Sequence, residues 1–217
     1  MAMPKAFYKE EDVKESYNLI MALKSELKGN FVVIGGWAVY NYTGIQKSKD
    51  IDIFANRESL DLLGKIYNFN YIDDTKILTT TIRNVELDVF STAVQSLPVS
   101  LKDIDSTFQF GKFNLTYVDE NLLLVMKTFA FFTRSALNSK KIKDGLDVCS
   151  LLFFSNIDFN FLYNYENYNI INFNDLKDII LRRILPMSYR YCDYLGLTEQ
   201  EYDEYWSDIR TQLESFE

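Results

Sequence analysis

A pair of aspartates has the type and spacing that metal chemistry requires. They alternate with isoleucines in the stretch Lys49-Asp50-Ile51-Asp52-Ile53-Phe54. Side chains two apart in a strand project from one face, so Asp50 and Asp52 would lie together while the isoleucines enter the core. Adjacent carboxylates repel each other, and a shared divalent cation is the usual reason for holding them together. A solvated edge strand with alternating acid and isoleucine is the competing interpretation.

A third acidic residue follows on a later apolar stretch, Val85-Glu86-Leu87-Asp88-Val89-Phe90. The alternation predicts a strand whose aliphatic residues face the core, with Asp88 on the opposite face. Asp88 is therefore the natural third carboxylate of a metal site. Glu86 shares its face and is either a supporting group or the ligand itself, if the strand register differs.

Two glycines follow the apolar run 31–34 and could form a phosphate cradle. Without a Cβ atom, Gly35 and Gly36 let backbone N–H groups approach an anion. A helix expected over 37–42 would direct its N-terminus to the same place. A tight turn is the alternative role of such a pair. The 13 residues 37–49 separate Gly36 from Asp50.

The composition narrows the choice of metal. The chain of 217 residues contains no histidine, which excludes Ser-His and Cys-His catalysis and every histidine-containing zinc site. Its two cysteines, Cys149 and Cys192, have no partner at metal-ligand spacing and are expected to be buried free thiols. Oxygen ligands remain, and they favour Mg²⁺ or Mn²⁺.

The motifs occur in a fixed order: an apolar strand, Gly35-Gly36, Asp50-Ile51-Asp52 and then Asp88. This order resembles the signature of the nucleotidyltransferase superfamily, whose fold is shared with the catalytic domain of DNA polymerase beta. The motifs cover Phe31–Phe90. The resemblance implies an α+β nucleotidyltransferase fold, with a mixed sheet flanked by helices and followed by a C-terminal helical bundle. It also implies Mg²⁺-dependent transfer of a nucleoside monophosphate from a nucleoside triphosphate (NTP) to an acceptor hydroxyl.

The resemblance assigns roles to seven residues. It makes three carboxylates both catalytic residues and metal ligands: Asp50, Asp52 and Asp88. It makes four further residues contacts of the nucleotide: Gly35, Gly36, Ser48 and Lys127.

The chain departs from the family in one motif. Family members often show Arg-x-Thr-x-Asp-x-Asp, and here Gln46 and Ser48 stand where arginine and threonine are usual. Lys47 and Lys49 are candidates for supplying the missing charge, although a lysine does not reproduce the guanidinium fork. Gln46 therefore leaves open a non-catalytic relative that binds a nucleotide or a partner.

The surrounding elements are predicted from periodicity and capping signals. Helices are expected over 10–28, 58–69, 122–137, 143–154, 175–194 and 199–215, and hairpins over 78–90 and 108–117. Asp119 and Thr198 are the expected N-caps of the third and last of these helices. We expect two domains, a nucleotidyltransferase domain over 1–118 and a helical domain over 119–217.

Lys127 lies within a helix that is apolar almost all round, where an unpartnered ammonium is costly. It would contact the triphosphate, or form a salt bridge, or extend to solvent. With Arg134 and Lys141 it would form one stripe if the helix continued that far. The helical half resembles the AbiEii-like branch of the superfamily, which has a lysine on a comparable helix and then a segment like Lys143-Asp144-Gly145-Leu146-Asp147.

The acceptor is left open by the sequence. AbiEii-like proteins include toxins of toxin–antitoxin pairs, some acting on tRNA, so tRNA and a cognate antitoxin protein are possible partners. An antibiotic-modifying nucleotidyltransferase and transfer to a protein hydroxyl are the alternatives. The start of the chain is already charged and no segment has the character of a membrane span, so a soluble cytoplasmic protein is expected.

Overall fold

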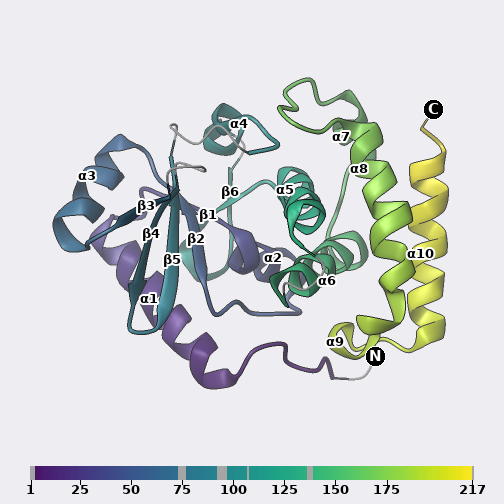
Figure 1. The fold of residues 1–217 in the computed structure, drawn as a ribbon, viewed down its shortest axis with the longest axis horizontal. Coiled ribbons are helices and arrows are strands. Elements are labelled where there is room, and N and C mark those ends of the chain that lie inside the picture. The colour runs from purple at the N-terminus through teal and green to yellow at the C-terminus, as the bar shows by residue number, and fades with distance from the viewer. Residues whose placement is uncertain (1–2, 73–76, 92–96, 107, 136–138, 217) are drawn as a thin grey trace.

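The computed structural model describes residues 3–72, 77–91, 97–106, 108–135 and 139–216. In these ranges the chain forms one mixed sheet flanked by helices, followed by a helical half, so the expected α+β class is confirmed (Figure 1). The strands are β1 (Val32–Ile34), β2 (Ile51–Phe54), β3 (Asn70–Ile72), β4 (Ile77–Ile82), β5 (Val85–Phe90), β6 (Phe108–Phe110) and β7 (Thr116–Val118). The helices are α1 (Glu10–Glu26), α2 (Gly35–Thr43), α3 (Arg57–Ile66), α4 (Leu101–Ser106), α5 (Glu120–Thr133), α6 (Ser139–Phe154), α7 (Phe159–Asn164), α8 (Phe173–Ile179), α9 (Cys192–Leu195) and α10 (Glu199–Glu214).

The strands follow the order β3-β4-β5-β2-β1-β7-β6. The β2–β5 and β1–β7 pairs are parallel, and the other pairs are antiparallel. The two central strands, β2 and β1, therefore each join a parallel and an antiparallel neighbour. In β2 and β5 the aliphatic positions are buried, with Ile51, Ile53, Leu87 and Val89 all fully covered, as the alternation predicts.

The two hairpins differ from each other in their turns. In the first hairpin, β4 and β5 are joined at Arg83 and Asn84, which both have positive φ, 50° and 66°. Positive φ at two consecutive residues is typical of the two-residue turns that join antiparallel strands, so this hairpin agrees with the prediction. In the second hairpin Lys112–Asn114 forms a 3₁₀ turn, so β7 begins at Thr116 and not at Phe113. Phe113 has a φ of 63°, which is incompatible with an extended strand.

Helices cover both faces of the sheet. Figure 1 shows α1 and α3 on one side and α2 with the helical half on the other. The predicted cap Asp119 accepts hydrogen bonds from the backbone of Asn121 and Leu122 at the start of α5. Thr198 and Glu201 form the predicted capping box of α10.

Two predicted helices are shorter than expected. Helix α5 ends at Thr133, and Arg134 is already extended, so Lys127, Arg134 and Lys141 do not form one continuous stripe. The helix expected over 175–194 divides into α8, a π-helical turn over Ile180–Ile184, a 3₁₀ turn over Leu185–Arg190 and α9. Pro186 lies in that 3₁₀ turn, where its missing N–H removes an α-helical hydrogen bond.

The N-terminal segment runs from α9 in the helical half across to α1 (Figure 1). The division into domains at residue 118 stays a prediction, and α2 packs against both α5 and α6 across that boundary. None of the helices within the described ranges is long and apolar enough to cross a bilayer.

Candidate active site

Two carboxylates lie on the same face of the neighbouring strands β2 and β5. Asp52 of β2 and Asp88 of β5 are direct partners in the parallel register, so their side chains project side by side. The Thr79 hydroxyl donates a hydrogen bond to the Asp88 carboxylate. Oδ1 of Asp88 is buried, and no described residue is its hydrogen-bond partner. A buried carboxylate oxygen without a donor is suited to a cation or to an incoming proton.

The electrostatics of this pair favour a bound cation. Burial, together with the charges of Asp88 and Asp50, raises the pKa of Asp52 to about 7. Burial also raises the pKa of Asp88 and of Asp50 above the ordinary range. The carboxylates therefore repel each other when all are ionised, and a divalent ion would relieve that repulsion.

Asp50 directly precedes β2 and lies near a lysine of α6. Its Oδ2 is 3.7 Å from Nζ of Lys140, which in turn lies 2.8 Å from Oε1 of Glu86. Within the described ranges, no three acidic side chains form a ready-made metal site. The donor set still fits Mg²⁺ or Mn²⁺, because it consists of carboxylates and includes the unpartnered Oδ1 of Asp88.

The two glycines allow the backbone to approach these groups. Gly35 has a φ of +66°, and a Cβ built on it would lie 2.0 Å from Oδ2 of Asp52. A Cβ on Gly36 would lie 2.8 Å from Oγ of Ser48. The N-terminus of α2 therefore begins directly beside the carboxylates, in a position where its free N–H groups could meet an anion.

Cations from the helical half face the carboxylates. Lys127 was expected to contact a triphosphate, to form a salt bridge or to extend to solvent. It forms ion pairs with Asp144 at 3.2 Å and with Asp147 at 2.8 Å. Lys143 pairs with the same Asp147, and Arg134 pairs with Asp144. Burial alone would raise the pKa of Asp147, but the two lysines hold that pKa below its ordinary range.

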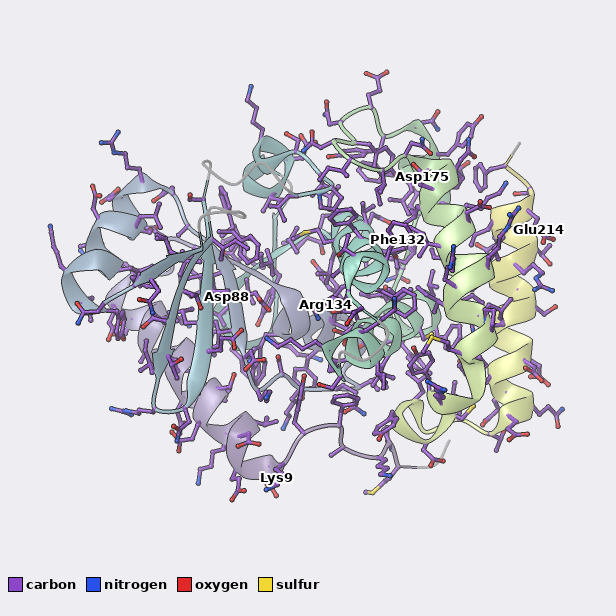
Figure 2. All side chains as sticks on the ribbon, in the orientation of Figure 1. Lys9, Asp88, Phe132, Arg134, Asp175 and Glu214 are labelled. Carbon is purple, nitrogen blue, oxygen red and sulfur yellow. The ribbon has the colours of Figure 1, made fainter. Side chains whose placement is uncertain are left out.

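All these groups surround one small charged cavity of about 60 Å³. Its lining consists of Tyr8, Gly36, Ser48, Asp50, Asp52, Glu86, Asp88, Lys127, Arg134, Lys140, Lys143, Asp144 and Asp147. Figure 2 shows Asp88 on the sheet and Arg134 on the side of the helical half. The structure thus brings together all three predicted carboxylates with Gly36, Ser48 and Lys127, while Gly35 lies against Asp52.

Tyr8 and Lys140 line this cavity but were not predicted from the sequence as site residues. Lys143 was named only as part of the segment Lys143-Asp144-Gly145-Leu146-Asp147. Lys140 and Lys143 belong to α6, whose Lys-rich start, Lys140-Lys141-Ile142-Lys143, was the available signal. The expected substitutes Lys47 and Lys49 do not line the cavity. They lie 5.7 Å and 5.5 Å from the ring centres of Tyr40 and Tyr8 instead. The positive charge of the cavity comes from Lys127, Arg134, Lys140 and Lys143.

Gln46 has a structural role away from the carboxylates. Its Oε1 accepts a hydrogen bond from the backbone of Phe7 at 3.0 Å. Its Nε2 donates to the carbonyls of Lys5 at 2.8 Å and Tyr194 at 2.7 Å. The glutamine at the family's arginine position therefore fastens the N-terminal segment to the helical half.

Comparisons with known proteins give distant structural likenesses. No family model matches the sequence, and no curated protein matches it. A crystal structure of ANT(2")-Ia in complex with adenylyl-2"-tobramycin resembles the chain with a TM-score of 0.46 and 16% identity, over 65% of this chain and 90% of that one. A solution structure of the antibiotic-resistance factor ANT(2'')-Ia resembles it with a TM-score of 0.48 and 15% identity, over 67% of this chain and 86% of that one. With both TM-scores below 0.5, a functional assignment depends on the geometry of the site.

Proposed function

We propose that this protein is a metal-dependent nucleotidyltransferase, which moves a nucleoside monophosphate from an NTP to an acceptor hydroxyl. One observation carries the proposal: Asp52 and Asp88 stand in parallel register beside the first turn of α2, with Oδ1 of Asp88 buried and without a donor among the described residues. A carboxylate pair next to free backbone N–H groups combines a cation site with an anion site, which is what a metal–triphosphate complex requires.

In this mechanism Asp50, Asp52 and Asp88 would hold Mg²⁺ or Mn²⁺, which when bound would stabilise charge on the phosphate oxygens. The acceptor oxygen attacks the α-phosphorus, its proton passes to the Asp88 carboxylate, and the bond to pyrophosphate breaks.

Phosphate binding is assigned to the start of α2 and the cations opposite it. The backbone at Gly35 and Gly36 would bind phosphate oxygens, and the Ser48 hydroxyl would donate a further hydrogen bond. Lys127 lines the cavity, but its ammonium is already held by two aspartates. Lys127 would therefore act on a triphosphate mainly through its charge, alongside Lys143.

The acceptor is proposed from the resemblance alone. Transfer to tRNA by the toxin of a toxin–antitoxin pair, with an antitoxin protein as partner, is one possibility. Modification of an antibiotic and transfer to a protein hydroxyl are the others, and all three use the same donor chemistry. The acceptor therefore has to be identified by experiment.

Incubation with each α-labelled NTP and Mg²⁺ tests the proposal, with total RNA, an aminoglycoside mixture or the protein alone as acceptor. We expect the wild-type protein to label one of these acceptors. In Asp52→Asn the labelling should fall by roughly 100-fold or more, since a neutral amide binds a divalent ion poorly. Asp61→Asn on the exposed face of α3 is the matched control and should transfer normally. Full activity in Asp52→Asn would refute the assignment. Nucleotide binding without label in wild-type protein would identify a non-catalytic relative.

A further inference from the structure

The carboxylate cavity is too small for the substrate that its chemistry suits. At about 60 Å³ it holds little more than an ion with its water, whereas ligand pockets usually measure roughly 300–1,000 Å³. A second cavity of about 330 Å³ lies next to it. Tyr8 lines both cavities, and no other described residue does.

The second cavity has the walls of a site for an aromatic ring. Its lining includes Phe7, Val13, Tyr40, Ile45 and Lys47. Aromatic side chains stack on nucleobases, and aliphatic side chains exclude water from them. Lys47, whose ammonium lies 5.7 Å from the centre of the Tyr40 ring, adds a positive charge, and Glu10 adds a negative one.

Tyr8 lines both cavities, and its side chain is held by contacts of its ring, with Phe7 and with the Lys49 ammonium 5.5 Å from the ring centre. The neighbouring backbone is fixed, because Gln46 binds Lys5 and Phe7 and the Lys5 N–H donates to the Asp193 carbonyl at 2.8 Å. The Tyr8 hydroxyl makes no hydrogen bond to any described residue, and its ring packs edge-on against Phe7 at 5.0 Å between centres. The side chain can therefore turn away while the segment that carries it stays in place.

We propose that the cavity lined by Val13 and Tyr40 is the nucleoside compartment of the donor NTP, and that the Tyr8 ring is a partition that turns aside to join it to the carboxylate cavity. The triphosphate then lies between α2 and the cations of α6, with the base among the aromatic side chains. This inference rests on the proposed function, since it requires an NTP as donor.

Filling the compartment tests its assignment. Val13→Trp should weaken the binding of the preferred NTP by about tenfold or more, because the indole would occupy space needed by the base. Calorimetry with Ca²⁺ in place of Mg²⁺ measures this binding. Inorganic tripolyphosphate should bind Val13→Trp as it binds wild-type protein, since it needs only the charged cavity. Ile66→Trp, on the exposed side of α3, is the control for the new indole and should bind NTP normally. Lys47→Ala, which adds no bulk, should weaken the binding of NTP by about threefold or more. It should leave the binding of tripolyphosphate unchanged.

Changing the partition tests the role of Tyr8. Tyr8→Ala joins the two cavities permanently, so NTP should bind several-fold more tightly than to wild-type protein, whereas Tyr8→Phe keeps the ring and should bind like wild type. Weaker NTP binding by Tyr8→Ala would overturn the partition and make Tyr8 a stacking residue.

The outcomes separate this inference from the proposed function. If NTP binds but Val13→Trp and Lys47→Ala leave its affinity unchanged, the nucleoside compartment is wrong while nucleotidyl transfer stands. If neither NTP nor tripolyphosphate binds the folded wild-type protein, the donor site is wrong, and the inference fails with it. If NTP binds through this compartment but no acceptor is labelled, the inference holds and only the transfer reaction is refuted.

Discussion

The backbone at Gly35 is left-handed and touches a carboxylate. Its φ of +66° is unfavourable for any residue with a Cβ, and the atom that Cβ would strike is Oδ2 of Asp52. The glycine therefore fixes two things together: the angle at which α2 leaves β1 and the position of the neighbouring carboxylate.

Gly35→Ala should destabilise the protein by at least about 1–2 kcal/mol, the usual penalty for an L-residue with left-handed backbone, and should reduce metal binding because Asp52 must move. Urea unfolding and Mg²⁺ titration measure the two effects. The control is Gly64→Ala in the exposed part of α3, where a Cβ meets nothing within 4 Å. That change should stabilise the protein by up to about 1 kcal/mol. Equal stability of the two variants would contradict the steric argument.

Some residues of the candidate site could be predicted from the sequence and others could not. Asp50, Asp52 and Asp88 could be proposed from the sequence, and they line one cavity in the structure, because strand alternation is local and fixes which side chains share a face. Tyr8 and Gln46 could not be assigned, because no periodicity describes an irregular segment. The hydrogen bond from Gln46 to Tyr194 spans 148 residues, and only the folded chain brings those residues together.

At the scale of elements, α5 and α6 are joined by a buried network of charges. Asp147 is fully covered and lies between Lys127 and Lys143, while Asp144 lies between Lys127 and Arg134. Each buried carboxylate thus has two cationic partners, which is the condition under which such groups are tolerated in a protein interior. The salt-bridge interpretation of Lys127 describes its observed contacts, and its contact with a triphosphate stays a prediction.

Asp147→Ala should lower the free energy of unfolding by about 3–5 kcal/mol, because it leaves two buried ammonium groups without this partner. The control is Asp178→Ala on α8, whose carboxylate is 56% exposed and pairs with Arg182 at 3.3 Å. Removing that exposed pair should change stability by less than about 1 kcal/mol. Denaturant unfolding of both variants compares them directly. A loss below about 1 kcal/mol in Asp147→Ala would mean that the lysines reach water in its absence.

The elements themselves were largely predictable, and their ends were not. Apolar periodicity and caps located α1, α3, α5 and α10, because these signals are carried within each segment. The early end of α5 at Thr133 and the start of β7 at Thr116 follow from backbone conformations at Arg134 and Phe113. Those conformations depend on contacts with other parts of the chain.

At the scale of the whole molecule, the N-terminal segment joins the two halves of the chain through one side chain. Gln46 is 3% exposed and makes all three of its hydrogen bonds to the backbone, at Lys5, Phe7 and Tyr194. An arginine at this position could not accept the hydrogen bond from Phe7. The departure from the family motif is therefore matched by a structural role of the glutamine.

Gln46→Ala should destabilise the protein by about 1–3 kcal/mol, since it leaves buried backbone groups unpaired. It should also make the chain around residues 3–9 easier to cleave in limited proteolysis, because the segment loses its attachment. Gln109→Ala is the control, as its amide makes only a long 3.4 Å contact to Asp119 on the exposed side. Unchanged cleavage of Gln46→Ala would show that the segment is held by its aromatic contacts instead.

The parallel pairing of β2 with β5 also determines when the site can form during folding. Antiparallel β4 and β5 are adjacent in the sequence and can pair as a local hairpin, whereas α3, β3 and β4 lie between β2 and β5. Pairing between residues so distant in sequence is slow, because chain entropy is lost before the contacts form. We therefore expect Asp52 and Asp88 to come together late, so that a partly folded chain with an intact hairpin would still lack this carboxylate pair.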